Sequence, residues 1–148
     1  MSRQMNEIER KFYDAFCDYY NLKGFGDEDG ILALAEKGGL NFNDLQVQFP
    51  IDLNIVDFYI ELLLPIATIS FAVEIDGHEY HKTKEQRYHD YVRERKLQAK
   101  GIIVVRFTAS EVFVNAEACV EELDIIMKKF YNDEYEQQLE HFHFLINK

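Results

Sequence analysis

The chain has no tryptophan, only two prolines and only two cysteines among its 148 residues. Cys17 and Cys119 stand far apart, so they match neither a zinc-binding spacing nor a disulfide framework. The longest apolar stretch, residues 62–73, is interrupted by a proline, a threonine and a serine and is too short to span a membrane. Residues 1–11 are polar and charged and show no secretory signal pattern. These absences favour a cytoplasmic protein over a secreted or membrane-spanning one.

Apolar residues are abundant and can fill a core. They make up 47% of the chain, with 12 phenylalanines and 9 tyrosines, which excludes a disordered chain. The length suits one domain with one core, and no repeat or low-complexity linker divides it. We therefore expect residues 1–148 to form a single domain, with 132–148 as a C-terminal helical extension.

Charge is distributed unevenly along the chain. The net charge of −11 taken alone argues against a nucleic-acid partner. However, eight of the sixteen Lys and Arg residues fall between Lys82 and Arg106, which gives that stretch a charge of +5 and leaves −16 for the rest. This basic segment is either a phosphate-binding surface or an ordinary solvated helix face.

Hydrophobic periodicity predicts the order of the elements. Apolar residues at three- and four-residue steps indicate helices, and alternation or short apolar runs indicate strands. The expected helices cover residues 4–22, 31–37, 83–100, 115–131 and 133–147, and the expected strands cover 45–49, 53–62, 69–76 and 102–107. Gly24 and Gly101 are expected to end helices, Pro50 to interrupt the first strand, and Asn115 to cap a helix.

This order defines the fold class. The almost continuously apolar strand 69–76 is expected at the centre of the sheet, paired as a hairpin with strand 53–62. Strand 102–107 follows it through a helical crossover, which favours a parallel pair. The prediction is an α/β protein with a mixed β-sheet flanked by helices.

Acidic residues interrupt two of the predicted strands. Glu74 and Asp76 are two residues apart on one strand and therefore point to the same side. Asp57 lies between Val56 and Phe58 on the neighbouring strand. Like charges held together are costly unless a cation lies between them. The three carboxylates can converge on one Mg²⁺ or Mn²⁺ ion, which takes oxygen ligands and keeps several waters.

A cation held beside a basic helix suits one class of chemistry. It activates a water and neutralises charge on a phosphoryl oxygen, while the helix contacts the phosphate backbone. The residues therefore indicate hydrolysis of a phosphodiester. The alternative is that the acids are ordinary strand-end and surface residues.

The ordered set of polar residues resembles a known family. The set is Glu9, Gln48, Val56-Asp57-Phe58, Val73-Glu74-Ile75-Asp76-Gly77, His81, Gln86, Asp90, Arg93, Gly101 and Arg106-Phe107. It is similar to the very-short-patch-repair-like endonucleases of the restriction-endonuclease (PD-(D/E)XK) superfamily, in particular to small members with a Glu-x-Asp-Gly-x-x-x-His signature. The resemblance covers about residues 5–127 and implies a restriction-endonuclease-like core (α-β-β-β-α-β-α), here with an extra C-terminal helix.

The resemblance also implies roles for individual residues. Asp57 and Glu74 would be metal ligands, and Asp76 stands where the superfamily usually has a lysine. In the repair endonucleases an aspartate of this Asp-Gly pair is itself a ligand, so Asp76 would complete the metal site. His81 matches a histidine that assists catalysis and suits general acid–base work near neutral pH. Lys82 or Lys84 can replace the missing lysine, and the spacing selects neither.

Further residues are expected to support the site. Gln86, Asp90 and Arg93 share one helix face, which either braces the site or contains an Asp90–Arg93 ion pair. Glu9 is either a further carboxylate or an exposed helix residue, and Gln48 completes the supporting set. The residues expected to bind nucleic acid are Lys82, Lys84, Arg87, Arg95 and Lys96.

The sequence thus predicts a Mg²⁺- or Mn²⁺-dependent endonuclease that acts on nucleic acid, with DNA as the expected substrate. Because no separate recognition domain is evident, targeting would rely on a protein partner or on a homodimer. Two alternatives stay open. One is a catalytically inactive nucleic-acid-binding module of the same fold, suggested by the missing lysine, and the other is an acidic protein-interaction domain, suggested by the net charge.

Overall fold

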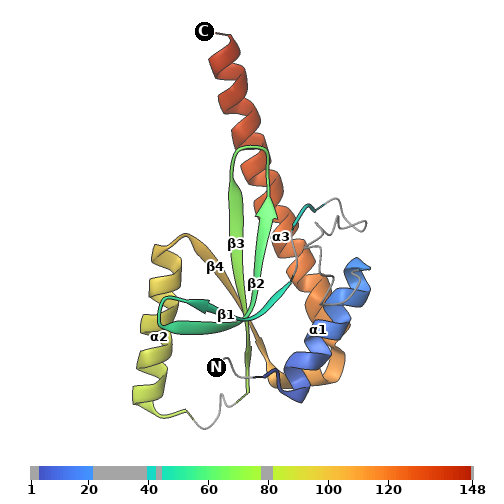
Figure 1. The fold of residues 1–148 in the computed structure, drawn as a ribbon, viewed down its shortest axis with the longest axis vertical. Helices are drawn as coiled ribbons and strands as arrows, with labels where there is room; N and C mark the ends of the chain where they lie inside the picture. Colours follow the sequence, from blue (N-terminus) through green and yellow to red (C-terminus); the bar gives the residue numbers. More distant parts are fainter. Residues whose placement is uncertain (1–3, 22–39, 43–44, 78–81, 148) are drawn as a thin grey trace.

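A four-stranded mixed sheet lies between α2 on one face and α1 and α3 on the other (Figure 1). The structure, a computed structural model, describes residues 4–21, 40–42, 45–77 and 82–147. The elements are α1 (Glu7–Tyr20), β1 (Gln46–Ile51), β2 (Asn54–Leu63), β3 (Thr68–Asp76), α2 (Lys84–Ala99), β4 (Ile102–Thr108) and α3 (Ala109–Ile146). The predicted fold class is confirmed, and the helix expected at 31–37 lies outside the described residues.

The strands follow one another across the sheet in the order β1-β2-β3-β4. The pairs β1–β2 and β2–β3 are antiparallel, and β3–β4 is parallel. Because α2 makes the crossover between the parallel strands, the predicted topology is confirmed. β3 has a strand on each side, which explains its continuous apolar sequence.

Each of the three helices in the described residues begins with a capping box, in which two side chains satisfy free backbone N–H groups at the helix start. The paired residues are Asn6 with Glu9, Thr83 with Gln86, and Thr108 with Glu111. Gly101 follows α2 with a φ of +80°, a backbone conformation that glycine adopts without strain. By contrast, α1 ends at Asn21, also in the left-handed region, before the predicted Gly24.

Two predicted breaks are wrong. Pro50 does not interrupt the first strand, because β1 is an edge strand and a proline there removes no hydrogen bond that the sheet requires. The helices expected at 115–131 and 133–147 are one continuous part of α3, whose C-terminal end projects beyond the sheet (Figure 1). Asn115 has non-helical angles, and its Oδ1 accepts a hydrogen bond from the Ala118 backbone, which is the capping role predicted for it.

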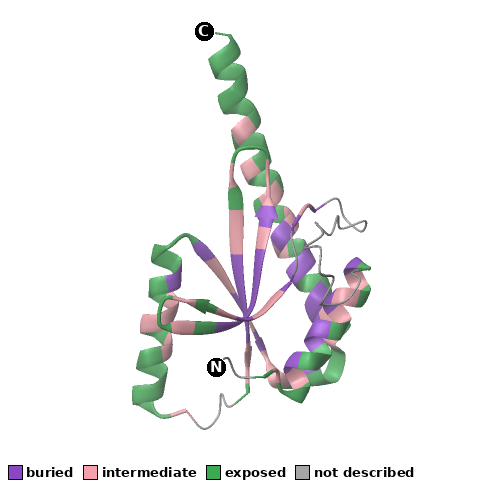
Figure 2. Ribbon diagram, viewed as in Figure 1, coloured by how far each residue is buried: buried purple, intermediate pink, exposed green. Residues whose placement is uncertain are grey.

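The core divides between the two faces of the sheet. The larger cluster joins aromatic residues of α1 to the strands and to the buried face of α3, and the smaller one contains Leu97 of α2. Figure 2 shows burial concentrated on the sheet and its contacts with α1 and α3, while the projecting end of α3 is exposed. α2 therefore contributes little apolar packing, and its polar face is available for the groups described next.

Candidate active site

Two buried carboxylates lie next to each other on neighbouring strands. The pairing of Phe58 with Val73 sets Asp57 of β2 beside Glu74 of β3, and both residues are less than a tenth exposed. Oδ2 of Asp57 accepts a hydrogen bond of 2.8 Å from the Ile75 backbone N–H, which fixes its position. The register of β2 and β3 thus places two acids of the predicted site together, and Arg93 of α2 contacts one of them.

Arg93 of α2 covers this pair. Its Nη2 lies 2.5 Å from Oε1 of Glu74 and donates a hydrogen bond of 2.6 Å to the Ile55 carbonyl. The contact with Arg93 is an ion pair, and Asp57 also lies within hydrogen-bonding reach of the Glu74 carboxyl group. Burial raises the pKa of Glu74 to about 7, with Asp57 adding to the rise and Arg93 opposing it. Glu74 is therefore a carboxyl group whose charge is only partly compensated.

The raised pKa of Glu74 predicts that this group stabilises the folded chain more at low pH than at high pH. The folded chain binds the Glu74 proton more tightly than the unfolded chain does. Protonation of Glu74 therefore stabilises the folded state fully below pH 4.5, and this stabilisation is lost as pH rises through about 7. In metal-free buffer, the unfolding free energy of the unmodified chain should fall relative to Glu74→Gln by about 1–3 kcal/mol between pH 5 and 8. Thermal melts of both proteins at several pH values measure this difference. A constant difference across that range contradicts the prediction.

Asp76 belongs to a network of ion pairs. Its Oδ1 lies 3.3 Å from Nζ of Lys82, and its Oδ2 lies 3.2 Å from Nη1 of Arg106 on β4. Lys82 also contacts Oδ2 of Asp90 at 2.6 Å, and Arg106 reaches Glu94 at 3.4 Å. The hydrogen bond to Asp90 is the largest cause of a raised Lys82 pKa, so this ammonium group stays charged at neutral pH.

The helix face predicted to support the site divides into separate contacts. Asp90 pairs with Lys82 and Arg93 pairs with Glu74, so these two residues have different partners instead of the alternative ion pair between them. Gln86 is exposed and caps the start of α2 through the Thr83 N–H. Arg93 and Asp90 therefore each contact a charged group of the candidate site, whereas Gln86 fixes where α2 begins.

Glu9 and Gln48 form a second buried polar contact. Nε2 of Gln48 donates a 3.1 Å hydrogen bond to Oε2 of Glu9, which is 1% exposed, so the exposed alternative for Glu9 is wrong. Gln48 has a φ of +47°, and β1 changes sides there: Val47 packs on the larger core cluster and Phe49 on the smaller one. Such local irregularities in strands are common beside active sites.

Among the described residues, no three His, Cys, Asp or Glu side chains form a group that could hold a metal ion. Asp57 and Glu74 are together, Asp76 is engaged by Lys82 and Arg106, and His81 lies outside the described residues. The catalytic and metal-binding roles of these residues stay predictions.

Sequence reasoning did not assign Arg106 or Glu94 to the site. Arg106 is part of the Arg106-Phe107 motif, which could have pointed to it. The spacing of Glu94 relative to the other acids gives no such signal.

Four other basic residues lie at the surface of α2. Lys84, Arg87, Arg95 and Lys96 are all exposed, whereas Lys82 is held among the acids. The structure therefore separates the two candidates for the missing lysine. Lys82 lies in the site, and Lys84 is on the surface.

Comparisons with known proteins agree with this architecture. The family model REase_MTES_1575 matches residues 34–126, more than half of the chain, and the chain belongs to this family of restriction-endonuclease-like domains. An uncharacterized protein of Haemophilus influenzae is 32% identical over 95 residues, which cover 64% of this chain and 70% of that protein. No solved structure matches the chain significantly. The family match includes the acids of β2 and β3 and all of α2, but not Glu9.

In the described part of the chain, no helix combines the length and the apolar character that a membrane span needs.

Proposed function

We propose that this chain is a metal-dependent nuclease that hydrolyses phosphodiester bonds, with DNA as the expected substrate. The observation that carries the proposal is the pair of buried carboxylates, Asp57 and Glu74, on adjacent strands beneath a basic helix. Its membership in a restriction-endonuclease-like family supports the same chemistry. The likeness of the motifs to very-short-patch-repair-like endonucleases is the more specific form of the proposal.

The residues present fit a divalent ion. Mg²⁺ commonly binds through one or two carboxylates, with waters and substrate oxygens completing its coordination. Glu74 and Asp57 are two adjacent buried carboxyl groups, and Arg93 compensates the charge of Glu74 only in part. In this proposal Asp57 and Glu74 hold Mg²⁺ or Mn²⁺, and Asp76 completes the site at its outer edge. A bound ion there would supply an activated water and neutralise charge on the phosphoryl group.

The cations around the acids have distinct proposed roles. Lys82 supplies the positive charge that superfamily members usually carry at the position of Asp76. Asp76 and Asp90 hold its ammonium group at the site, where it can donate a hydrogen bond to a phosphoryl oxygen. Arg93 orients Glu74, and His81 is the proposed proton donor or acceptor. The exposed residues Lys84, Arg87, Arg95 and Lys96 contact flanking phosphates.

A second candidate function is favoured by one observation. Arg93, Lys82 and Arg106 already contact the acids of the site, and this arrangement would also suit a nucleic-acid-binding module without catalysis. Such a module would bind DNA in a salt-sensitive manner and would not cleave it.

A cleavage assay combined with calorimetry tests the proposal. Labelled single- and double-stranded DNA and RNA are incubated with the protein in Mg²⁺, in Mn²⁺ or in EDTA, and Mn²⁺ binding is titrated separately. We expect cleavage only with metal, and one Mn²⁺ site per chain. Salt-sensitive binding with neither cleavage nor metal uptake would support the inactive module instead. Absence of any nucleic-acid binding would leave the acidic protein-interaction domain.

A further inference from the structure

A small polar pocket lies at the network of ion pairs around Asp76. It has a volume of about 240 Å³ and is lined by Asp76, Lys82, Arg87, Asp90, Tyr91 and Arg106. Pockets for free small-molecule ligands are usually about 300–1,000 Å³. This pocket is therefore more suitable for part of a polymer, such as one nucleotide, than for a separate small ligand.

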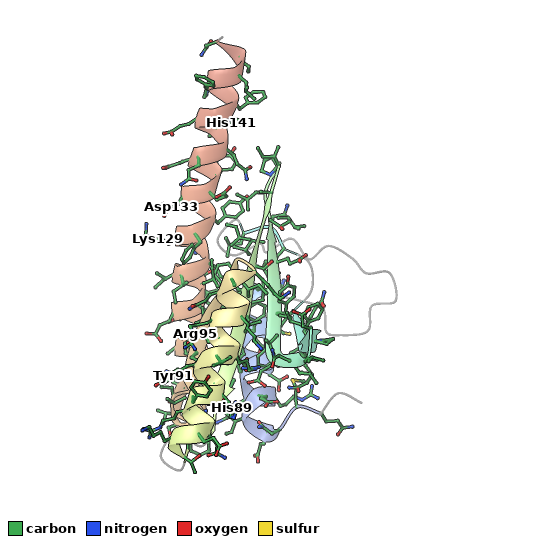
Figure 3. All side chains as sticks on the ribbon, turned by 90° about the vertical axis from the view of Figure 1, so that its left-hand side faces the viewer. His89, Tyr91, Arg95, Lys129, Asp133 and His141 are labelled. Atoms are coloured by element: carbon green, nitrogen blue, oxygen red, sulfur yellow. The ribbon has the colours of Figure 1, made fainter. Side chains whose placement is uncertain are left out.

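Basic residues surround Tyr91 along one side of α2. Lys84, Arg87, Tyr91 and Arg95 are spaced three or four residues apart, so their side chains follow one side of the helix. Figure 3 looks onto α2 and labels Tyr91 and Arg95, both of which are exposed. No described carboxylate lies within ion-pair distance of Arg87, in contrast to Lys82 and Arg106. We call these four residues the α2 stripe.

The large aromatic side chain of Tyr91, exposed among charged residues, needs an explanation. Tyr91 is 58% exposed, although it lines a pocket in which every other residue is charged. Its ring makes no stacking contact with another ring in the described part of the chain. Aromatic side chains beside a basic groove bind single-stranded nucleic acid, because every base has a face that can stack on the ring.

We propose that Tyr91 stacks against an unpaired base and that Arg87 and Arg95 contact the adjoining phosphates, so that the α2 stripe selects single-stranded nucleic acid. This inference rests on the proposed nuclease function and names its substrate class. In a duplex the base faces are covered by neighbouring base pairs, so only the phosphates are available to the stripe. A single strand uses both the ring and the arginines, and it passes directly beside Asp76 and Lys82 at the edge of the candidate active site.

Binding to matched oligonucleotides tests this inference. Fluorescence anisotropy in EDTA compares a labelled 12-nucleotide single strand, as DNA and as RNA, with the blunt DNA duplex of the same sequence. Tyr91→Ala is expected to weaken single-strand binding about 5- to 100-fold and to leave duplex binding unchanged. Tyr91→Phe keeps the ring and should bind nearly as the unmodified chain does. Tyr88→Ala is the matched control, because Tyr88 is 61% exposed on the same helix and does not line the pocket.

Two further readouts separate stacking from a general effect on the fold. A 2-aminopurine in the single strand should be quenched by the unmodified chain and not by Tyr91→Ala, and thermal melts should show equal stability. Arg87→Ala should reduce the slope of log affinity against log salt by about one. Unchanged single-strand binding by Tyr91→Ala, or an equal loss with Tyr88→Ala, overturns the inference. In that case metal-dependent cleavage that requires Glu74 would still support the proposed function, whereas absence of cleavage would reject that function itself.

Discussion

Glu74→Gln is expected to abolish metal-dependent cleavage, with a loss of at least about 10³-fold in rate. A metal ion typically stabilises a transition state by several kcal/mol, and each 1.36 kcal/mol corresponds to a factor of ten in rate. Glutamine has nearly the size of glutamate but lacks the charge that retains the ion. Asp57→Asn should have the same effect because the two carboxylates lie side by side.

The fold should survive this change. Glu74 is buried with a raised pKa, and glutamine resembles its neutral form, so the melting temperature at pH 7 should be equal or higher. Glu85→Gln provides the matched control, because Glu85 lies at the exposed start of α2, away from the site. Single-turnover cleavage and Mn²⁺ calorimetry measure the effect. A Glu74→Gln protein that cleaves at the unmodified rate would disprove the assignment.

Lys82→Ala is expected to reduce cleavage about 10²-fold and to leave Mn²⁺ binding intact. Removing one preorganised hydrogen-bond donor to a developing negative charge typically lowers the rate by about this factor. Lys129→Ala is the control, because it removes the same charge from an exposed position on α3, on the other face of the sheet. Lys82→Arg should recover part of the rate, since it restores the charge with a different geometry.

A stability measurement distinguishes the proposed role of Lys82 in cleavage from a structural role. Lys82→Ala leaves Asp76 and Asp90 without one shared partner, which should lower the melting temperature slightly. Asp90→Asn also weakens this contact but keeps the ammonium group beside Asp76. If Asp90→Asn reduces cleavage as much as Lys82→Ala does, Lys82 acts only by maintaining the structure.

Much of the fold could be predicted because its patterns are local. The sequence alternation in β2, the apolar run of β3 and the Gly101 stop after α2 each depend on neighbouring residues. The errors concern features that depend on distant contacts. Pro50 is tolerated because β1 happens to lie at the edge of the sheet, and α3 continues because nothing after residue 131 breaks its helix.

The closeness of Asp57 and Glu74 could also be predicted, but the partners of the basic residues Lys82, Arg93 and Arg106 could not. Antiparallel pairing of two adjacent strands is enough to bring Asp57 beside Glu74. The partners Arg93, Lys82 and Arg106 depend on how α2 and β4 pack on the sheet, and no spacing encodes that packing. Burial of Glu9 likewise requires α1 to lie against β1, which a helix pattern alone does not specify.

The order of strands in the sheet has a consequence for how the chain assembles. The β1-β2-β3 meander joins segments close in sequence and forms with little loop-closure entropy, whereas pairing of β3 with β4 must first close the long crossover. Both members of the carboxylate pair are in the meander, whereas Arg93, the cation that contacts Glu74, belongs to the crossover. We therefore expect the two acids to remain hydrated until the crossover docks, and to lose water in the same event that brings Arg93.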